Sequence, residues 1–243
     1  MEQDMNRPDR LEQVRAALDT VTDPEIDESV TALEFISRVE VNDDNDVCVE
    51  FRLPTFWCAP NFAFMMASDM RDAVTEIDWV HSVSVRLLDH FSADLINRGI
   101  ALKQDFRDAF PGETDDDLES VRLKFLGKAF ERRQELLMRH LLGIGCKAEW
   151  MTQISLQDLM GLSLDSAGAR LRTLYIFAWR RLRAERPDAD LAFVALNEDP
   201  LEPSQLPNYL RKIGGVRRNA EYNGLICRSL LAERKAEMAG VSD

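Results

Sequence analysis

The fold of the N-terminal part is decided by residues 46–60, which read DVCVEFRLPTFWCAP. From Val47 to Leu53, apolar residues alternate with Cys, Glu and Arg, and this period of two is typical of a strand with one buried face. Pro54 interrupts the strand, and Pro60 suits the first position of a helix. The stretch therefore predicts a strand, a short loop that carries Cys58, and a helix.

The segments around this stretch predict a small domain. Apolar residues recur at helical spacing from Leu11 to Val21, and residues 33–41 are rich in β-formers. The sequence NDDND at 42–46 is a turn signal between this run and the next strand, so the two runs should form a hairpin. A helix from Pro60 and a third strand near 82–88 follow. The class is α+β, with the order α-β-β-α-β and a three-stranded sheet covered by two helices.

Charge divides the chain in two. Its 243 residues carry 43 acidic and 30 basic side chains, a net charge of −13. Residues 1–90 hold 20 of the acidic and 7 of the basic side chains, so the remainder is balanced. We expect two domains, 1–90 and 91–243. The sequence pI near 4.8 argues against a binder of nucleic acid or of anionic membranes, because both need a basic surface.

Residues 91–243 should be mostly helical. The predicted helices begin near Ser92, near Thr114 (whose spacing to Asp117 resembles a capping box), at Ser155, before Leu171 and at Asn219, with a proline-containing loop at 197–207. The last of these helices should end near Met238, and Cys227 should pack within it.

Cys58 is the sharpest chemical signal. It lies just before a predicted helix N-terminus, where unpaired N–H groups and the helix dipole favour an anion. A thiolate there would be a good nucleophile and metal ligand. Asp23 and Glu25 lie on another loop that could approach the same end of the sheet. The alternative is that Cys58 is a small buried hydrophobe and that Asp23-Pro24-Glu25 only ends a helix.

Residues 1–90 resemble the iron–sulfur cluster assembly domain family that includes PaaD, SufT and the eukaryotic cytosolic targeting factors. The resemblance is carried by the element order, by Asp23-Pro24-Glu25 after the first helix, and by Leu53-Pro54-Thr55-Phe56-Trp57-Cys58 before the second. It implies a role in iron–sulfur cluster biogenesis or delivery, with a transient cluster or iron. Cys58, Asp23 and Glu25 would then bind the metal or cluster, and Pro54, Thr55, Trp57 and Pro60 would support the Cys58 loop.

The whole layout, with its helical tail, is similar to accessory proteins of bacterial diiron monooxygenase systems. That similarity implies a maturation factor rather than a catalyst, whose client is an oxygenase component. The chain also departs from the family pattern, because only Phe56 and Trp57 separate Thr55 from Cys58, and Ala59 stands between Cys58 and Pro60. These departures favour an alternative, a protein-interaction adaptor or chaperone that keeps the fold without the metal chemistry.

The remaining expectations concern partners and location. Arg180, Arg181 and Arg183 belong to an arginine-rich stretch that could bind an acidic partner or the acidic N-terminal domain. The sequence shows no phosphate loop and no pairing of a base with a nucleophile, so we do not expect an enzyme. Four widely spaced cysteines and an N-terminus without an apolar stretch favour the cytoplasm. The sequence is compatible with a homo-oligomer.

Overall fold

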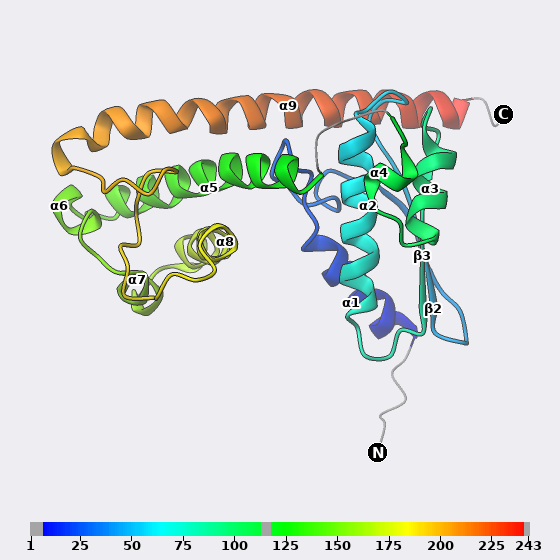
Figure 1. Ribbon diagram of the computed structural model, residues 1–243, viewed down its shortest axis with the longest axis horizontal. Coiled ribbons are helices and arrows are strands. Elements are labelled where there is room, and N and C mark those ends of the chain that lie inside the picture. The colour runs from blue at the N-terminus through cyan, green and yellow to red at the C-terminus, as the bar shows by residue number, and fades with distance from the viewer. Residues whose placement is uncertain (1–6, 113–117, 241–243) are drawn as a thin grey trace, which may run out of the picture. The chain divides into compact units, whose positions relative to one another are not determined.

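The computed structural model describes residues 7–112 and 118–240 (Figure 1). The chain forms two compact units. Unit 1 comprises Met1–Ser120 and Tyr222–Asp243, and unit 2 comprises Val121–Glu221. The boundary that the sequence predicts at residue 90 lies within unit 1.

Unit 1 is built on a three-stranded sheet of order β1-β2-β3. Its elements up to residue 112 are α1 (Arg7–Asp19), β1 (Ile36–Val41), β2 (Asp46–Arg52), α2 (Pro60–Thr75), β3 (Ser82–Leu88), α3 (Ala93–Ala101) and α4 (Phe106–Ala109). β1 and β2 pair antiparallel as a hairpin, whereas β2 and β3 run parallel. The predicted α+β class and the order α-β-β-α-β are confirmed.

The first strand starts later than the β-rich run from Leu33 suggests. Residues 30–35 fold into turns, with the Leu33 N–H donating to the Ser29 carbonyl and the Phe35 N–H to the Val30 carbonyl. Glu34 has a φ of 59°, a left-handed conformation that no strand accommodates. Pairing therefore starts only at Ile36, which lies opposite Phe51.

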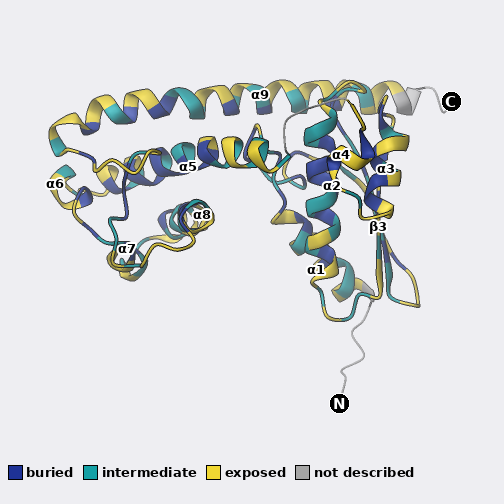
Figure 2. Ribbon diagram, viewed as in Figure 1, coloured by how far each residue is buried: buried dark blue, intermediate teal, exposed yellow. Residues whose placement is uncertain are grey.

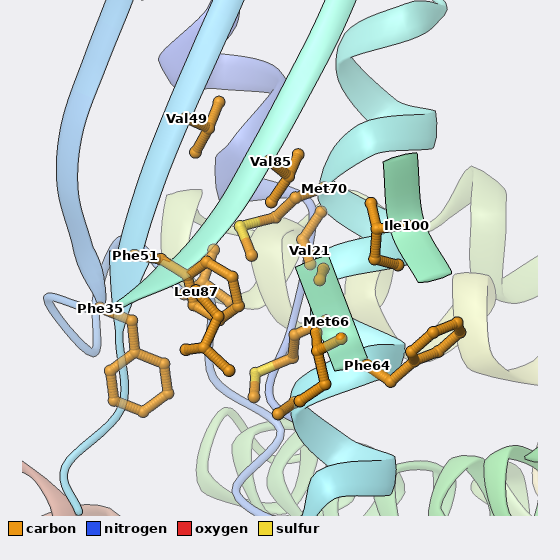
Figure 3. Close-up of a cluster of buried hydrophobic side chains, with 14 of the residues drawn as sticks. Val21, Phe35, Val49, Phe51, Phe64, Met66, Met70, Val85, Leu87 and Ile100 are labelled. Atoms are coloured by element: carbon orange, nitrogen blue, oxygen red, sulfur yellow. The ribbon is translucent and has the colours of Figure 1, made fainter. Parts of the chain in front are cut away.

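The core of unit 1 lies between the sheet and α2. The alternation predicted for β2 is present, because Val47, Val49 and Phe51 are buried while the residues between them are half-buried. Figure 3 shows side chains from β2 and β3 facing those of α2, among them Met66 and Met70. Buried residues run along much of α2 (Figure 2). The apolar face of β2 is therefore buried against the methionine-rich face of α2.

α3 is a third helix that packs on the sheet, in addition to the two helices predicted to cover it, α1 and α2. α3 packs against both β3 and α2, and Asn97 in it accepts from the Leu87 N–H at 2.7 Å and donates to the Leu87 carbonyl at 3.0 Å. Gly99 lets α3 approach its neighbours, since a Cβ there would stand 2.7 Å from the Ala109 Cβ and 2.9 Å from a ring carbon of Phe64.

Unit 2 has its own apolar core, which includes Phe130, Tyr175, Trp179 and Phe193. Its elements are most of α5 (Leu118–Gly143), α6 (Ala148–Met151), α7 (Leu156–Gly161), α8 (Ser166–Leu182), a 3-10 turn (Pro203–Gln205) and the first part of α9 (Leu206–Gly240). The short helix predicted to begin at Ser155 is α7, and Ser155 caps it in a capping box with Asp158. The predicted Thr114–Asp117 cap lies outside the described residues.

The last helix begins earlier than predicted. The sequence places its start at Asn219, but α9 starts at Leu206, so the predicted loop ends at residue 205. Leu206, Leu210 and Ile213 are buried in the core of unit 2, and this packing outweighs the low helix propensity of the Gly214-Gly215 pair that follows. Within residues 7–112 and 118–240, no helix combines the length and apolar character that crossing a membrane requires.

Candidate functional site

Cys58 lies on the loop between β2 and α2, as predicted. Pro60 is the first residue of α2 and Ala59 is its N-cap, so Cys58 lies immediately before the N-terminus of this helix. Its side chain is half-buried and packs against the core of unit 1. The Thr55 Oγ1 lies 3.2 Å from the Cys58 Sγ, within hydrogen-bond distance of a sulfur. The loop therefore presents the thiol at the edge of the core with a hydroxyl beside it.

His90 fixes the backbone of this loop. Its Nδ1 accepts from the Ser92 N–H at 3.1 Å, which leaves the proton on Nε2. Nε2 lies 2.7 Å from the Cys58 carbonyl and donates to it. Burial lowers the pKa of His90 below its ordinary 6.5 and so favours this neutral tautomer. Sequence analysis assigned His90 no role at the Cys58 loop.

Asp23 shapes a tight turn rather than ending a helix, since α1 already stops at Asp19. The Asp23 Oδ1 accepts from the backbone N–H groups of Glu25 and Ile26, each at 2.9 Å. Only 8 % of Asp23 is exposed, and this burial raises the pKa of its carboxyl from 3.8 to about 6. Glu25, by contrast, is exposed.

The C-terminal part of α9 docks on unit 1 beside these two loops (Figure 1). Its docked face comprises Gly224, Arg228, Leu231, Arg234 and Lys235. The Arg228 Nη1 lies 2.7 Å from the Glu28 Oε2, and Leu231 is buried in the same core as the sheet. A Cβ on Gly224 would stand 3.1 Å from the Ile26 side chain. The helix thus rests closely on the turn that Asp23 organises.

Arg234 ties the same face to the ends of two strands. Its Nη1 donates to the Leu53 carbonyl at 2.8 Å, and its Nη2 donates to the Asp89 carbonyl. Leu53 directly follows β2 and Asp89 directly follows β3. The backbone just before the Cys58 loop and the backbone just after β3 are therefore both bonded to α9, a helix that sequence analysis placed in the C-terminal region.

Cys227 joins the three predicted site residues. It is half-buried, packs against the same core as Cys58, and lies one helical turn from both Gly224 and Leu231 on the docked face. Burial, helped by the negative charges of Asp23 and Glu25, raises the pKa of the Cys227 thiol to about 11. Cys227 is therefore within electrostatic range of the predicted site residues, although the sequence predicts it only as a packed residue.

This neighbourhood does not form a complete coordination shell. Among the described residues, no group of three or more His, Cys, Asp and Glu side chains is arranged to hold a metal ion. Its donors are two thiols and two carboxylates, and thiolates are the groups that hold iron in iron–sulfur clusters. The donor chemistry therefore suits iron, while the geometry offers an incomplete ligand set.

An exposed aromatic surface adjoins the Cys58 loop. It comprises Phe56, Trp57 and Phe91, whose exposed fractions are 54 %, 62 % and 62 %. The Phe56 and Trp57 rings meet edge to face with centroids 4.5 Å apart, and the Phe91 N–H donates to the Phe56 carbonyl at 3.0 Å. Phe91 also stacks on His90. Trp57 is thus a surface residue, and the surface continues to the backbone that holds Cys58.

The three arginines predicted to bind a partner differ in exposure. Arg180 is exposed and pairs with Asp188 at 3.2 Å, and Arg181 is also exposed. Arg183 is 6 % exposed, its guanidinium lies over the Phe130 ring, and it donates to the Ala195 carbonyl. Arg183 therefore belongs to the interior of unit 2, and only the other two are available at its surface.

Comparison with known proteins bears on unit 1. No curated protein matches the chain. Residues 11–85, less than a third of the chain, match the family model described as iron-sulfur cluster assembly protein. The matched segment contains Asp23, Glu25 and Cys58 but neither His90 nor α9. Residues 11–85 therefore resemble the iron–sulfur cluster assembly family, and this resemblance supports a role in cluster assembly.

Proposed function

We propose that this protein is a maturation factor that takes up iron or an iron–sulfur cluster at Cys58 and transfers it to a protein client. The observation that carries the proposal is the family match over residues 11–85, because this segment contains the Cys58 loop and the Asp23 turn. The half-buried Cys58 thiol, with the Thr55 hydroxyl 3.2 Å from its sulfur, supports it.

The incomplete ligand set suits a cargo that must leave again. A structural metal site holds its ion with a full set of protein ligands, and the ion then contributes to the stability of the fold. Here the described residues offer no such full set, and the core of unit 1 is built from apolar side chains. The iron or cluster is therefore a substrate that the protein passes on, in our proposal, and not a resident cofactor.

We further propose that the client is a component of a multicomponent oxygenase and that the protein acts in the cytoplasm as an accessory factor, not as a catalyst. This part rests on the similarity of the layout to accessory proteins of diiron monooxygenase systems. The aromatic surface beside Cys58 supports a protein partner, since exposed aromatic side chains commonly anchor protein interfaces.

Anaerobic reconstitution with ferrous iron and sulfide tests the proposal. The wild-type protein should gain cluster absorbance and bound iron, and the Cys58→Ala variant should lose both while keeping its circular dichroism spectrum. Cys48→Ala is the matched control, because Cys48 is also half-buried but lies on β2, on the face of that strand opposite the core. Equal iron in wild type and Cys58→Ala would refute the role of this thiol.

The aromatic surface supports a second candidate, an adaptor or chaperone without metal chemistry. The absence of a three-ligand group among the described residues favours it as well. Coexpression with the oxygenase components encoded nearest to this gene distinguishes the two functions. Stable binding to a component by a protein that takes up no iron supports the adaptor. Iron uptake together with Cys58-dependent activation of the component supports the maturation factor.

A further inference from the structure

Unit 2 contains a cavity of about 200 Å³ at the C-terminal end of α8. Its polar lining comprises Trp179, Arg183, Arg186, Asp190 and Glu198. Since one water molecule in the liquid takes up about 30 Å³, the cavity has room for a small ion together with a few water molecules. All of these residues belong to unit 2, so the cavity shares none of them with the Cys58 site.

Two side chains of this lining carry buried N–H groups that have no hydrogen-bond acceptor. Trp179 is 1 % exposed and Arg183 is 6 % exposed. Within residues 7–112 and 118–240, no acceptor lies within hydrogen-bond distance of the Trp179 Nε1 or of the Arg183 Nε and Nη1. Indole and guanidinium groups can only donate, and a buried donor without an acceptor is costly. A ligand that suits this cavity therefore supplies acceptor atoms.

The Glu198 carboxylate approaches Arg183 without bonding to it. Its Oε1 lies 3.7 Å from the Arg183 Nε, which is an ion-pair distance but too long for a hydrogen bond. Its Oε2 is bonded to Arg186, which also pairs with Asp190 at 3.6 Å. Glu198 is tethered to a loop whose backbone is left-handed at this residue, with a φ of 70°. A free ion has no such tether and can come closer to the Arg183 Nε.

Contacts inside unit 2 fix the Arg183 side chain at the cavity. Its Nη2 donates to the Ala195 carbonyl at 3.2 Å, and its guanidinium carbon lies 4.5 Å from the centre of the Phe130 ring. Both contacts hold the guanidinium in place without using its Nε. The positive charge of Arg183 is therefore in position before any ligand binds.

We propose that this cavity binds a small oxyanion, a carboxylate or phosphate group, which takes the place of the Glu198 carboxylate between Arg183 and Arg186. Trp179 offers its indole N–H to a further oxygen of the ion. The lining is balanced in charge while Glu198 occupies it, with two arginines against two carboxylates. The Glu198 side chain is 44 % exposed and can turn to solvent. Two arginines then face only Asp190, and the oxyanion neutralises the excess positive charge through charge-assisted hydrogen bonds.

The indole N–H resonance of Trp179, observed by NMR in the full chain, tests the site. The chain has four tryptophans. Trp179→Phe identifies the resonance by its loss, while an aromatic ring stays in the core. Sodium phosphate should shift this resonance along a saturable curve, and sodium chloride of the same ionic strength should leave it in place. No shift in phosphate, or the same shift in chloride, would overturn the proposal.

Three charge variants separate binding at the cavity from binding elsewhere. Arg186→Gln should weaken phosphate binding about 10-fold, because it removes a charged donor to the ion. Arg180→Gln is the matched control, since Arg180 is also exposed but pairs with Asp188, which does not line the cavity. Glu198→Gln should tighten binding about 2- to 5-fold by removing the competing carboxylate, a gain that loss of the fold cannot produce. Equal affinity in Arg186→Gln and Arg180→Gln, or weaker binding in Glu198→Gln, would refute the site.

Sodium acetate in the same titration distinguishes the two sources of the oxyanion. A saturable shift with acetate supports a site that accepts carboxylates, and a shift with phosphate alone supports a site for phosphate groups. Absence of both shifts would contradict the proposal. The site goes beyond the proposed function and does not depend on it, so Cys58→Ala should bind phosphate as wild type does.

Discussion

Arg234 donates to the backbone carbonyl of Leu53 at 2.8 Å, although 181 positions separate the two residues. The contact joins the last helix to the end of β2, immediately before the Cys58 loop. Its second donor reaches the Asp89 carbonyl at the end of β3. One guanidinium thus satisfies the carbonyls that follow two neighbouring parallel strands, and the candidate site lies beside this clamp.

Removing the clamp should loosen α9. Hydrogen bonds from a charged donor contribute about 1.5–3 kcal/mol each when buried, and water will partly replace these two, so Arg234→Ala should lower the free energy of unfolding by about 1–2 kcal/mol. Amide hydrogen exchange in residues 222–237 should accelerate. Lys235→Ala is the control, because its pair with Glu34 is exposed and should contribute about 0–1 kcal/mol. Equal protection in Arg234→Ala and wild type would show that the clamp is not what holds the helix.

The close approach of α3 makes a second prediction. A Cβ on Gly99 would stand 2.7 Å from the Ala109 Cβ and 2.9 Å from a Phe64 ring carbon, so the helix must shift to accept it. Gly99→Ala should therefore destabilise unit 1 by about 1–2 kcal/mol in urea denaturation, despite the better helix propensity of alanine. Gly143→Ala, which meets nothing within 4 Å at the end of α5, should be neutral or stabilising. The prediction fails if the two substitutions behave alike.

Sequence analysis predicted the parts of this fold that depend on local patterns. The alternation from Val47 to Leu53 and the helix start at Pro60 are both present, because each is written into consecutive residues. Long-range placement was not predictable in the same way. Cys227 is 169 positions from Cys58, and no local signal marks which face of a helix will dock on a distant domain. Gly224, which permits that close contact, is indistinguishable in sequence from a residue that weakens the helix.

The buried carboxylate of unit 2 gives a third prediction. The Glu135 side chain has no exposed surface; it accepts from the Arg217 Nε at 2.8 Å and from the Arg139 Nε. Glu135→Ala removes both contacts and opens a cavity, whereas Arg217 keeps its pair with Glu221 and Arg139 is half-exposed, so unit 2 should lose about 1–3 kcal/mol of stability. Asp188→Ala, which removes the exposed pair with Arg180, should change stability by about 0–1 kcal/mol. Thermal unfolding of the two variants separates these effects, and similar shifts in both would contradict the prediction.

The buried Asp23 predicts how stability depends on pH. Its folded pKa is about 6 against an ordinary 3.8, so between these values the folded protein binds the proton more tightly than the unfolded chain does. The contribution of this group to stability therefore falls as pH rises from about 4 to about 6. At pH 7 the ionised carboxylate should destabilise the protein by on the order of 3 kcal/mol.

Asp23→Asn tests this directly, because its amide oxygen can still accept from the Glu25 and Ile26 N–H groups. The variant should be about 1–3 kcal/mol more stable than wild type at pH 7, and the difference should vanish as pH falls towards 4. Asp46→Asn should behave in the opposite way. Hydrogen bonds from Ser82 and Asn42 lower the pKa of the half-buried Asp46, so its contribution is present at neutral pH and is lost in acid. Urea denaturation of both variants between pH 4 and pH 7 measures the two slopes. A loss of stability in Asp23→Asn that stays the same from pH 4 to pH 7 would contradict the prediction, because the ionisation of this carboxyl would then not affect stability.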